Sequence, residues 1–216
     1  MRTRFPDRAS AGRALAYLVA DAVESDVVVL GLPNGGLAVA APIAKALKAP
    51  LGVAWVAKLA LPREPGVVLG AVDIDGDVTL NPEALRAERV DGETLTELSF
   101  HARERLRARV RGVVPELAYK TVVVVDDGLT TGVTLSCALR WARGRGAARL
   151  VVAVPVVDAR IWSRVSEDAD QAVTLDIRPD GPIARSDVYE LFQRVENHEI
   201  DKLIRRGGRG ATPARR

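Results

Sequence analysis

TVVVVDDGLTTGVTL, residues 121–135, joins three kinds of sequence in direct succession. A run of four valines, typical of a buried strand, ends on Asp126 and Asp127. A turn rich in glycine and threonine follows, and the residues after it have the pattern of a helix. This order predicts an α/β unit in which the turn and the two acids lie at the carboxyl end of a strand, where parallel sheets bind ligands.

The rest of the chain continues this alternation of apolar strands with helices. Continuous apolar runs indicate strands buried on both faces, which is typical of a parallel sheet covered by helices. Two β-like runs within 67–80 flank Asp75-Gly76, and this pattern predicts a hairpin. Ser10 is the expected N-cap of the first helix. The expected strands are 27–30, 51–59, 121–125, 149–154 and 171–177, and the expected helices are 10–23, 37–47, 94–111, 132–143 and 158–166.

Together these elements predict an α/β fold: a Rossmann-like, mostly parallel sheet with flanking helices and a small flap.

The charge of the chain is concentrated at its C-terminus. RRGGRGATPARR, residues 205–216, contains five arginines and no acid, so of the net charge of +3 it carries +5 and leaves −2 for residues 1–204. We expect one domain over 1–204 and a basic, disordered tail over 205–216.

The nearly neutral body predicts no specific nucleic-acid partner, and weak contact of the tail with a polyanion or a membrane surface is the alternative. No apolar run approaches the roughly 20 residues that a membrane-spanning helix needs. The N-terminus, MRTRFPDRAS, has no apolar core of a signal peptide, and Cys137 is the single cysteine of the chain. These features predict a cytoplasmic protein without membrane contact.

The turn after the valine strand has the residue types of an anion-binding loop. Gly128 and Gly132 let the backbone turn and approach a ligand closely. Successive N–H groups in such a turn form an anion nest, and the following helix adds its positive end. Thr130, Thr131 and Thr134 add hydroxyl donors. The loop is therefore predicted to bind a phosphate monoester.

Asp126 and Asp127 need a partner other than the phosphate, because like charges repel. Carboxylates accept hydrogen bonds from vicinal hydroxyls and attract Mg²⁺ directly or through water. A phosphate loop beside two carboxylates thus predicts a sugar phosphate with a Mg²⁺ ion nearby, held indirectly by these acids. We expect both side chains at a solvent-facing strand end, and a purely structural strand end or N-cap is the alternative.

VVVVDDGLTTGVTL, residues 122–135, resembles the ribose-phosphate signature of the type I phosphoribosyltransferases, an apolar strand followed by two acids and a loop ending in Thr-Gly-x-Thr. The resemblance implies the type I phosphoribosyltransferase fold. It also implies that Asp126 and Asp127 hold the ribose hydroxyls of phosphoribosyl pyrophosphate (PRPP). The 5′-phosphate would lie in the loop made of Gly128, Leu129, Thr130, Thr131, Gly132, Val133 and Thr134.

Other stretches resemble a branch of stand-alone bacterial phosphoribosyltransferases. VAKLALPREPGVVLGAV, residues 56–72, resembles the second loop and flap of that branch, which gives Lys58 a catalytic position. GLPNGGLAVAAPIAKAL, residues 31–47, resembles the strand, loop and helix that face pyrophosphate, and its loop residues are Pro33, Asn34, Gly35 and Gly36.

The C-terminal stretch DVYELFQRVENHEIDKLI, residues 187–204, resembles the closing segment of the same branch. This resemblance implies that Tyr189 and Phe192 lie near the acceptor, as part of a hood over the site. The resemblance as a whole covers residues 10 to 204.

The chain departs from the branch at three positions. Asn34 stands where an arginine is usual, Ala57 where a second basic residue is usual, and Gly66 where an acid is common. Loss of two cations weakens the binding of pyrophosphate and its stabilisation as a leaving group. Lys58, Arg63 and bound Mg²⁺ would compensate in part.

Two functions stay open on this basis. The first is transfer of the phosphoribosyl group of PRPP, with Mg²⁺, to an unidentified acceptor with release of pyrophosphate. The second is a non-catalytic regulatory protein that binds PRPP or a nucleotide. A receiver-like domain with a phosphorylated aspartate is disfavoured by the chain length. Thr130 disfavours a purine acceptor, because purine-salvage enzymes place an aspartate there and threonine cannot act as an acid or base near neutral pH.

The remaining reactive residue types are expected to be structural. His101 and His198 have no Cys or His at ligand spacing, so we expect surface or packing roles for them. Cys137 is expected to be a small buried apolar residue, and the three tryptophans are expected to pack in the core or at its rim. The basic run RERLRARVR, residues 103–111, is expected to be a solvated helix face, and a contact in a homodimer is the competing interpretation.

Overall fold

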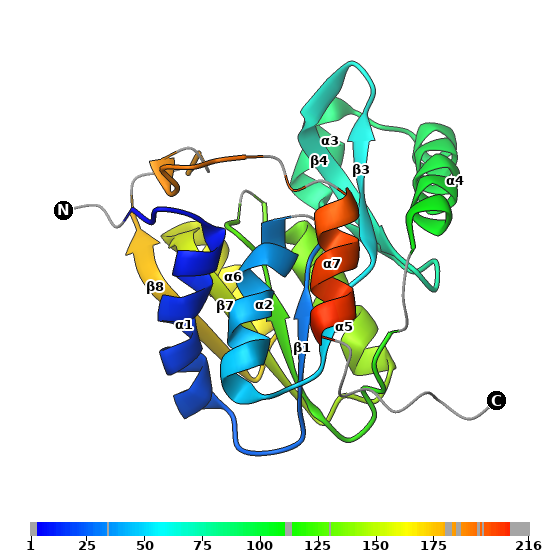
Figure 1. The fold of residues 1–216 in the computed structure, drawn as a ribbon. Coiled ribbons are helices and arrows are strands. Elements are labelled where there is room, and N and C mark those ends of the chain that lie inside the picture. The colour runs from blue at the N-terminus through cyan, green and yellow to red at the C-terminus, as the bar shows by residue number, and fades with distance from the viewer. Residues whose placement is uncertain are drawn as a thin grey trace.

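A computed structural model describes residues 4–33, 35–110, 114–129, 131–179, 183–184, 187–193, 195 and 197–207. Figure 1 shows a larger sheet with helices on both faces and a smaller sheet beside its upper edge. The helices are α1 (Arg8–Ala22), α2 (Gly35–Leu47), α3 (Pro82–Glu88), α4 (Gly92–Arg109), α5 (Val133–Gly144), α6 (Ala159–Glu167) and α7 (Asn197–Gly207). The strands are β1 (Val27–Gly31), β2 (Leu51–Val53), β3 (Val56–Leu61), β4 (Glu64–Asp73), β5 (Val78–Leu80), β6 (Thr121–Val125), β7 (Arg149–Asp158) and β8 (Gln171–Arg178).

The larger sheet is parallel throughout and has the strand order β2-β1-β6-β7-β8. Its central strand β6 pairs with β1 from Val27 opposite Thr121 to Gly31 opposite Val125. This register brings the carboxyl ends of β1 and β6 to the same edge, so the loops that follow them are neighbours. The predicted α/β fold with a mostly parallel sheet is therefore confirmed.

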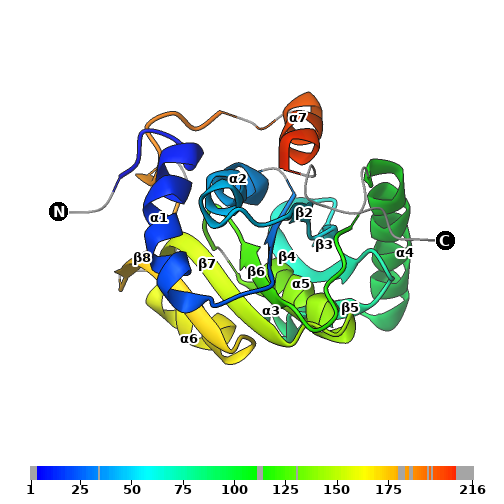
Figure 2. The same cartoon turned by 60° about the horizontal axis from the view of Figure 1, so that its bottom comes forward.

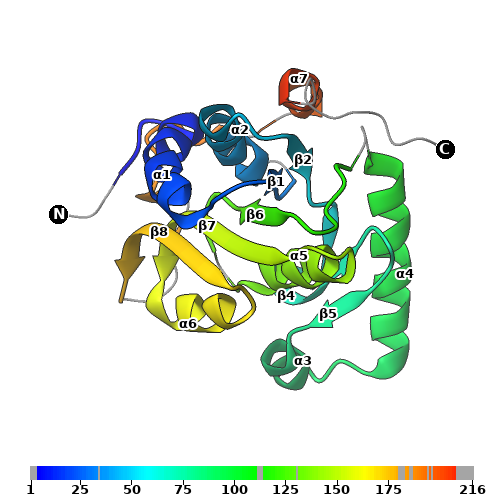
Figure 3. The same cartoon turned by 90° about the horizontal axis from the view of Figure 1, so that it is seen from below.

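The valine runs are explained by the two apolar faces that this sheet presents. Val29 and Val123 pack in a core with α1, α2 and α7, whereas Val28 and Val122 pack in a second core with α5 and α6. Figures 2 and 3 show the same division, with α1, α2 and α7 on one side of the sheet and α5 and α6 on the other. Because both faces are covered, successive strand residues are apolar and no alternation appears.

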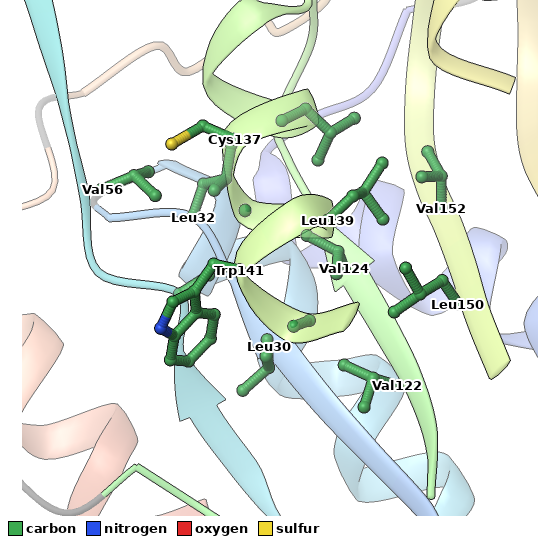
Figure 4. Packing of buried hydrophobic residues seen from close by; sticks show 14 of the residues in the cluster. Leu30, Leu32, Val56, Val122, Val124, Cys137, Leu139, Trp141, Leu150 and Val152 are labelled. Atoms are coloured by element: carbon green, nitrogen blue, oxygen red, sulfur yellow. The ribbon is translucent and has the colours of Figure 1, made fainter. Parts of the chain in front are cut away.

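Helix α5 is held against the sheet by the residues drawn in Figure 4. Leu139 and Trp141 belong to the core that also contains Val124 and Val152. Cys137 is buried in the same cluster, 1% exposed, which agrees with the expected packing role. Since α5 begins directly after the Gly/Thr loop, this packing fixes where that loop ends, at Gly132.

The smaller sheet is antiparallel, with the order β3-β4-β5, and contains the predicted hairpin. A carboxylate oxygen of Asp73 accepts hydrogen bonds from the backbone N–H groups of Asp75, Gly76 and Asp77, at 2.9, 2.9 and 3.0 Å. Asp75 in turn accepts 2.9 Å hydrogen bonds from Nε1 of Trp141 and Nε of Arg145. The hairpin turn is thus tied to α5, the helix that follows the Gly/Thr loop.

Several local predictions were wrong. The N-cap of α1 is Asp7, whose carboxylate accepts a 2.6 Å hydrogen bond from the backbone N–H of Ser10, so Ser10 lies inside the helix. The predicted strand 51–59 is two strands in different sheets, separated at Ala54 and Trp55. Helix α3 was not predicted, because its seven residues bury no side chain and give no periodic signal.

Three predictions concern residues outside the described ranges: those for Asn34, for Thr130 and for residues 208–216 of the tail. Residues 205–207, predicted as the start of that disordered tail, form the end of α7 instead. In the part of the chain that is described, no helix has both the length and the apolar character needed to cross a bilayer.

Candidate functional site

The loops after β1 and β6 contact each other closely at the carboxyl edge of the sheet. The backbone N–H of Leu32 donates a 2.8 Å hydrogen bond to the carbonyl of Val125. A Cβ added to Gly36 would lie 2.6 Å from that same carbonyl oxygen, and one added to Gly35 would lie 1.9 Å from Oδ2 of Asp127. Glycine is therefore required at both positions for this approach. Gly35 and Gly36, predicted as loop residues, form the first turn of α2.

A cavity of about 850 Å³ opens at this edge. It is bounded by the loops after β1 and β6, the β2–β3 segment, the C-terminal part of α4 and the segment around Phe192. The residues that line it are Arg8, Leu32, Pro33, Gly35, Trp55, Val56, Ala57, Lys58, Arg105, Leu106, Ala108, Arg109, Asp126, Asp127, Leu129, Thr131, Gly132, Thr134, Leu135, Phe192 and Val195. Most of the predicted site residues therefore surround one space.

The two acids have different environments. Asp126 is half-buried and lines the cavity, and its Oδ1 accepts a 2.8 Å hydrogen bond from the backbone N–H of Asp127. Asp127 also lines the cavity but is only 3% exposed. The expectation of two solvent-facing side chains was thus wrong for Asp127, because a cation and an aromatic segment cover it.

That cation is Arg8, in the first turn of α1. Its Nε donates a 2.8 Å hydrogen bond to Oδ2 of Asp127, and its Nη1 donates a 2.7 Å hydrogen bond to the carbonyl of Gln193. Its guanidinium carbon lies 4.5 Å from the centroid of the Phe192 ring. Arg8 therefore joins the second acid of the motif to the C-terminal segment.

Sequence reasoning missed Arg8, although the chain contains one signal for it. The N-terminal end of a helix is positive and disfavours a cation, yet α1 begins with arginine and has no acid in its first turn. Asp7, the N-cap, is one acid beside this cation, so the signal pointed to Arg8 but not to Asp127 as its partner.

Tyr189 supports the same acid from the C-terminal segment. Its hydroxyl donates a 2.7 Å hydrogen bond to the carbonyl of Asp127, and its ring is 1% exposed. The ring stacks on Phe192 with 6.4 Å between centroids. Tyr189 therefore has no ring face open to a ligand in this structure. Phe192, which is 47% exposed and lines the cavity, is the member of the pair that can contact one.

The Gly/Thr loop leads into α5 through a left-handed residue. Gly132 is the N-cap of α5 and has φ of +73°. A Cβ there would lie 2.7 Å from Cγ2 of Val165 on α6, so both the backbone conformation and the packing require glycine. Thr131 and Thr134 line the cavity beside it, whereas Gly128 and Val133 do not.

The predicted pyrophosphate side of the site contains Pro33 and Gly35, which line the cavity, and Lys58, an exposed residue of β3 that lines it too. Ala57 lines the cavity without adding charge. Arg63 does not line it, and its Nη2 contacts Oε2 of Glu88 at 3.4 Å.

The donor set of the site fits a Mg²⁺ ion that is held mainly by its ligand. Within the described residues, no group of three or more His, Cys, Asp and Glu side chains is placed to hold a metal ion. Mg²⁺ commonly binds through one or two carboxylates, several waters and the phosphates of a substrate. Asp126, which lines the cavity, is the side chain that fits this mode.

Comparison with known proteins identifies the family. The phosphoribosyl transferase domain model matches residues 6–182. Two relatives from Mycobacterium tuberculosis, strains CDC 1551 and H37Rv, are named as phosphoribosyl transferases by inference, and each is 38% identical to this chain over 213 residues. That alignment covers 95% of the chain but 47% of each relative, so the chain spans about half their length.

Solved structures show the same fold. The crystal structure of TT1426 from Thermus thermophilus superimposes with a TM-score of 0.79 at 34% identity, and the match covers 95% of this chain and 100% of that one. AQ2163 from Aquifex aeolicus gives a TM-score of 0.51 at 14% identity, over 82% of this chain and 76% of that one, which supports the fold alone. The chain belongs to the phosphoribosyl transferase domain family.

Proposed function

We propose that the cavity binds PRPP together with Mg²⁺ and that the protein transfers the phosphoribosyl group to an acceptor, with release of pyrophosphate. The observation that carries this proposal is the meeting of the Gly/Thr loop, Asp126 and Lys58 around one cavity in a chain of this family. A phosphate, a pair of hydroxyls and a diphosphate are the three groups that these elements would bind.

The 5′-phosphate is assigned to the loop at 128–134. Gly132 has no side chain with which to cap α5, and the end of a helix without such a cap can be satisfied by an anion. Thr131 and Thr134 line the cavity beside it and can donate their hydroxyl protons to phosphate oxygens. The close approach of Gly132 to Val165 of α6 fixes the position of Gly132 at the start of α5.

The ribose hydroxyls are assigned to Asp126, with Asp127 acting behind it. Asp126 lines the cavity and offers carboxylate oxygens, which accept hydrogen bonds from hydroxyls. The backbone N–H of Asp127 donates to Asp126, so fixing Asp127 through Arg8 and Tyr189 also fixes the first acid. In this proposal Asp127 is partly a positioning residue.

Mg²⁺, when bound with the diphosphate, would neutralise the charge that develops on the leaving pyrophosphate. Lys58 would add a cation to the same oxygens. A nucleophilic atom of the acceptor forms a bond to the anomeric carbon, the bond from that carbon to the pyrophosphate oxygen breaks with its electron pair, and the acceptor loses a proton to solvent. Phe192 would pack against the acceptor.

A calorimetric titration with PRPP, with and without Mg²⁺, tests the binding step. Binding that depends on Mg²⁺ and is weakened by Asp126→Asn is the expected result. Absence of PRPP binding by the wild-type protein would overturn the proposal. Release of pyrophosphate from PRPP in the presence of a panel of nitrogenous bases then tests turnover.

The same measurements separate catalysis from regulation. Ala57 and Asn34 replace two cations that the related branch carries, and this favours a regulatory protein that binds PRPP or a nucleotide as the second candidate. Tight binding of PRPP without release of pyrophosphate for any base in the panel would favour that candidate.

A further inference from the structure

Two arginines in the C-terminal part of α4 line the cavity, although the sequence predicted them on a solvated helix face. Arg105 and Arg109 both line it, together with Lys58 of β3. Figure 1 shows α4 beside β3, and Figure 3 shows α4 and α5 on opposite sides of the smaller sheet. The basic run 103–111 is therefore divided between residues that line the cavity and residues that do not.

Helical spacing explains the division. Ala102 and Leu106 are buried, and Leu106 packs in the core that contains Trp55. Arg105 and Arg109 lie one turn apart, on the side of the helix next to this buried stripe. Arg107 lies on the opposite side, is 71% exposed, and its Nη1 contacts Oε1 of Glu104 at 2.9 Å.

The charge of the cavity supports a role for this wall. Among the described lining residues there are four cations and two carboxylates. The cations are Arg8, Lys58, Arg105 and Arg109, and the carboxylates are Asp126 and Asp127, of which Asp127 pairs with Arg8. Lys58, Arg105 and Arg109 come from β3 and α4, whereas the Gly/Thr loop contributes no Lys or Arg.

We propose that Arg105 and Arg109 of α4, with Lys58, form an anion-binding subsite that is separate from the loop at 128–134. Its ligand chemistry is a diphosphate or a carboxylate: the pyrophosphate end of the sugar donor or an acidic acceptor. The assignment of the ligand rests on the proposed function, whereas the existence of the subsite rests on the position of the three cations. In this chain the subsite supplies the cations that Asn34 and Ala57 do not.

Helix stability alone gives a competing reason for these arginines, since the negative end of a helix favours cations. Arg107 is the control for that explanation, because it lies in the last turn with Arg109, two residues after Arg105, and does not line the cavity. If the subsite exists, Arg105→Gln and Arg109→Gln should weaken ligand binding more than Arg107→Gln does. If the arginines only stabilise the end of the helix, the three variants should bind ligands equally well.

The experiment is calorimetric titration of wild type, Arg105→Gln, Arg109→Gln and Arg107→Gln with four ligands. These are pyrophosphate with Mg²⁺, PRPP with Mg²⁺, ribose 5-phosphate, and benzoate in the presence of ribose 5-phosphate. All three residues are exposed, so the variants should fold, which a thermal melt checks. We expect Arg105→Gln and Arg109→Gln each to weaken the binding of pyrophosphate or of benzoate by roughly fivefold or more. Arg107→Gln should weaken the same binding by less than about twofold.

The pattern over the ligands identifies the source of the anion. Weaker binding of pyrophosphate and PRPP, with ribose 5-phosphate unchanged, assigns the subsite to the diphosphate. If only the binding of benzoate is weaker, the subsite is assigned to an acidic acceptor. Equal effects of the three substitutions on every ligand would overturn the subsite while PRPP binding by the wild type still supports the proposed function. Pyrophosphate binding that depends on Arg105 in a protein that does not bind PRPP would support the subsite and overturn the proposed function.

Discussion

Nε of Arg8 lies 2.8 Å from Oδ2 of Asp127, a residue 119 positions away in the chain. The side chains of the two residues are 11% and 5% exposed, so the ion pair is shielded from water. The same arginine donates to the carbonyl of Gln193, and the carbonyl of Asp127 accepts from Tyr189. The pair therefore holds the start of α1, the end of β6 and the C-terminal segment together.

Removal of the cation should reduce stability. Arg8→Gln leaves the Asp127 carboxylate buried without this cation, which should lower the free energy of unfolding by about 3 kcal/mol. Denaturant unfolding measures this. Arg13→Gln is the control, since Arg13 is exposed on the same helix and donates to Oγ of Ser10, and it should change stability by less than about 0.5 kcal/mol. Equal stabilities of the two variants would show that the ion pair does not hold these segments together.

Substitutions of Asp126 and Asp127 should differ in their effects on stability. Asp126→Asn should weaken PRPP binding by about 1.5–3 kcal/mol for a lost charge-assisted contact, and Asp127→Asn should also weaken it, because Asp127 positions Asp126. Only Asp127→Asn should also lower the melting temperature clearly, because it removes the carboxylate that pairs with Arg8. Calorimetry and a thermal melt of the two variants check this, and an unchanged PRPP affinity in both would refute the ribose assignment.

The loop glycine should be essential for stability and for phosphate binding. Gly132→Val introduces a Cβ that clashes with Val165 at a left-handed φ, and this should cost at least about 1–3 kcal/mol and abolish phosphate binding. Gly144→Ala, at the other end of α5, meets no atom within 4 Å and should be neutral or slightly stabilising. Unfolding curves and titration with phosphate measure both effects. Phosphate binding by a folded Gly132→Val protein would contradict the assignment of the loop.

Restoring the missing cation should improve the binding of the diphosphate. Asn34 follows Pro33 and precedes Gly35, both of which line the cavity. Asn34→Arg should tighten pyrophosphate and PRPP binding by roughly tenfold, and by more than Asn34→Lys, because a guanidinium matches phosphate geometry in a bidentate way. Affinity for ribose 5-phosphate should barely change. Equal gains for all three ligands would show that residues 31–36 do not face the diphosphate.

The single cysteine should destabilise the protein at alkaline pH. Burial raises the pKa of the Cys137 thiol to about 12 from its ordinary value of 9.0. Above pH 9 the unfolded chain loses this proton before the folded protein does, so stability should fall as pH rises from 9 toward 12, by up to about 1.4 kcal/mol per pH unit. The difference in unfolding free energy between wild type and Cys137→Ala, measured from pH 8 to 10, isolates this effect. A difference that does not change with pH would contradict the burial of the thiol, as would rapid alkylation of the native protein at pH 8.5.

Much of the fold and the centre of the site followed from contiguous sequence. The valine runs of β1, β6 and β7 indicated strands covered on both faces, and the strand, acids, loop and helix at 121–135 are adjacent in the chain. Their mutual geometry is therefore set by local backbone conformation, which a short sequence pattern specifies. The break between β2 and β3 was not predictable, because 51–59 is almost entirely apolar and only the sheet in which each half pairs divides it.

Tertiary structure alone decided what surrounds that centre. Arg8 reaches Asp127 because α1 and the C-terminal segment both dock at the end of β6, and no periodicity in either segment encodes that meeting. Arg105 and Arg107 are identical in residue type and two positions apart, yet only Arg105 lines the cavity. Ala102 and Leu106 indicate which side of α4 is buried, but which cavity that side borders depends on how α4 packs on β3.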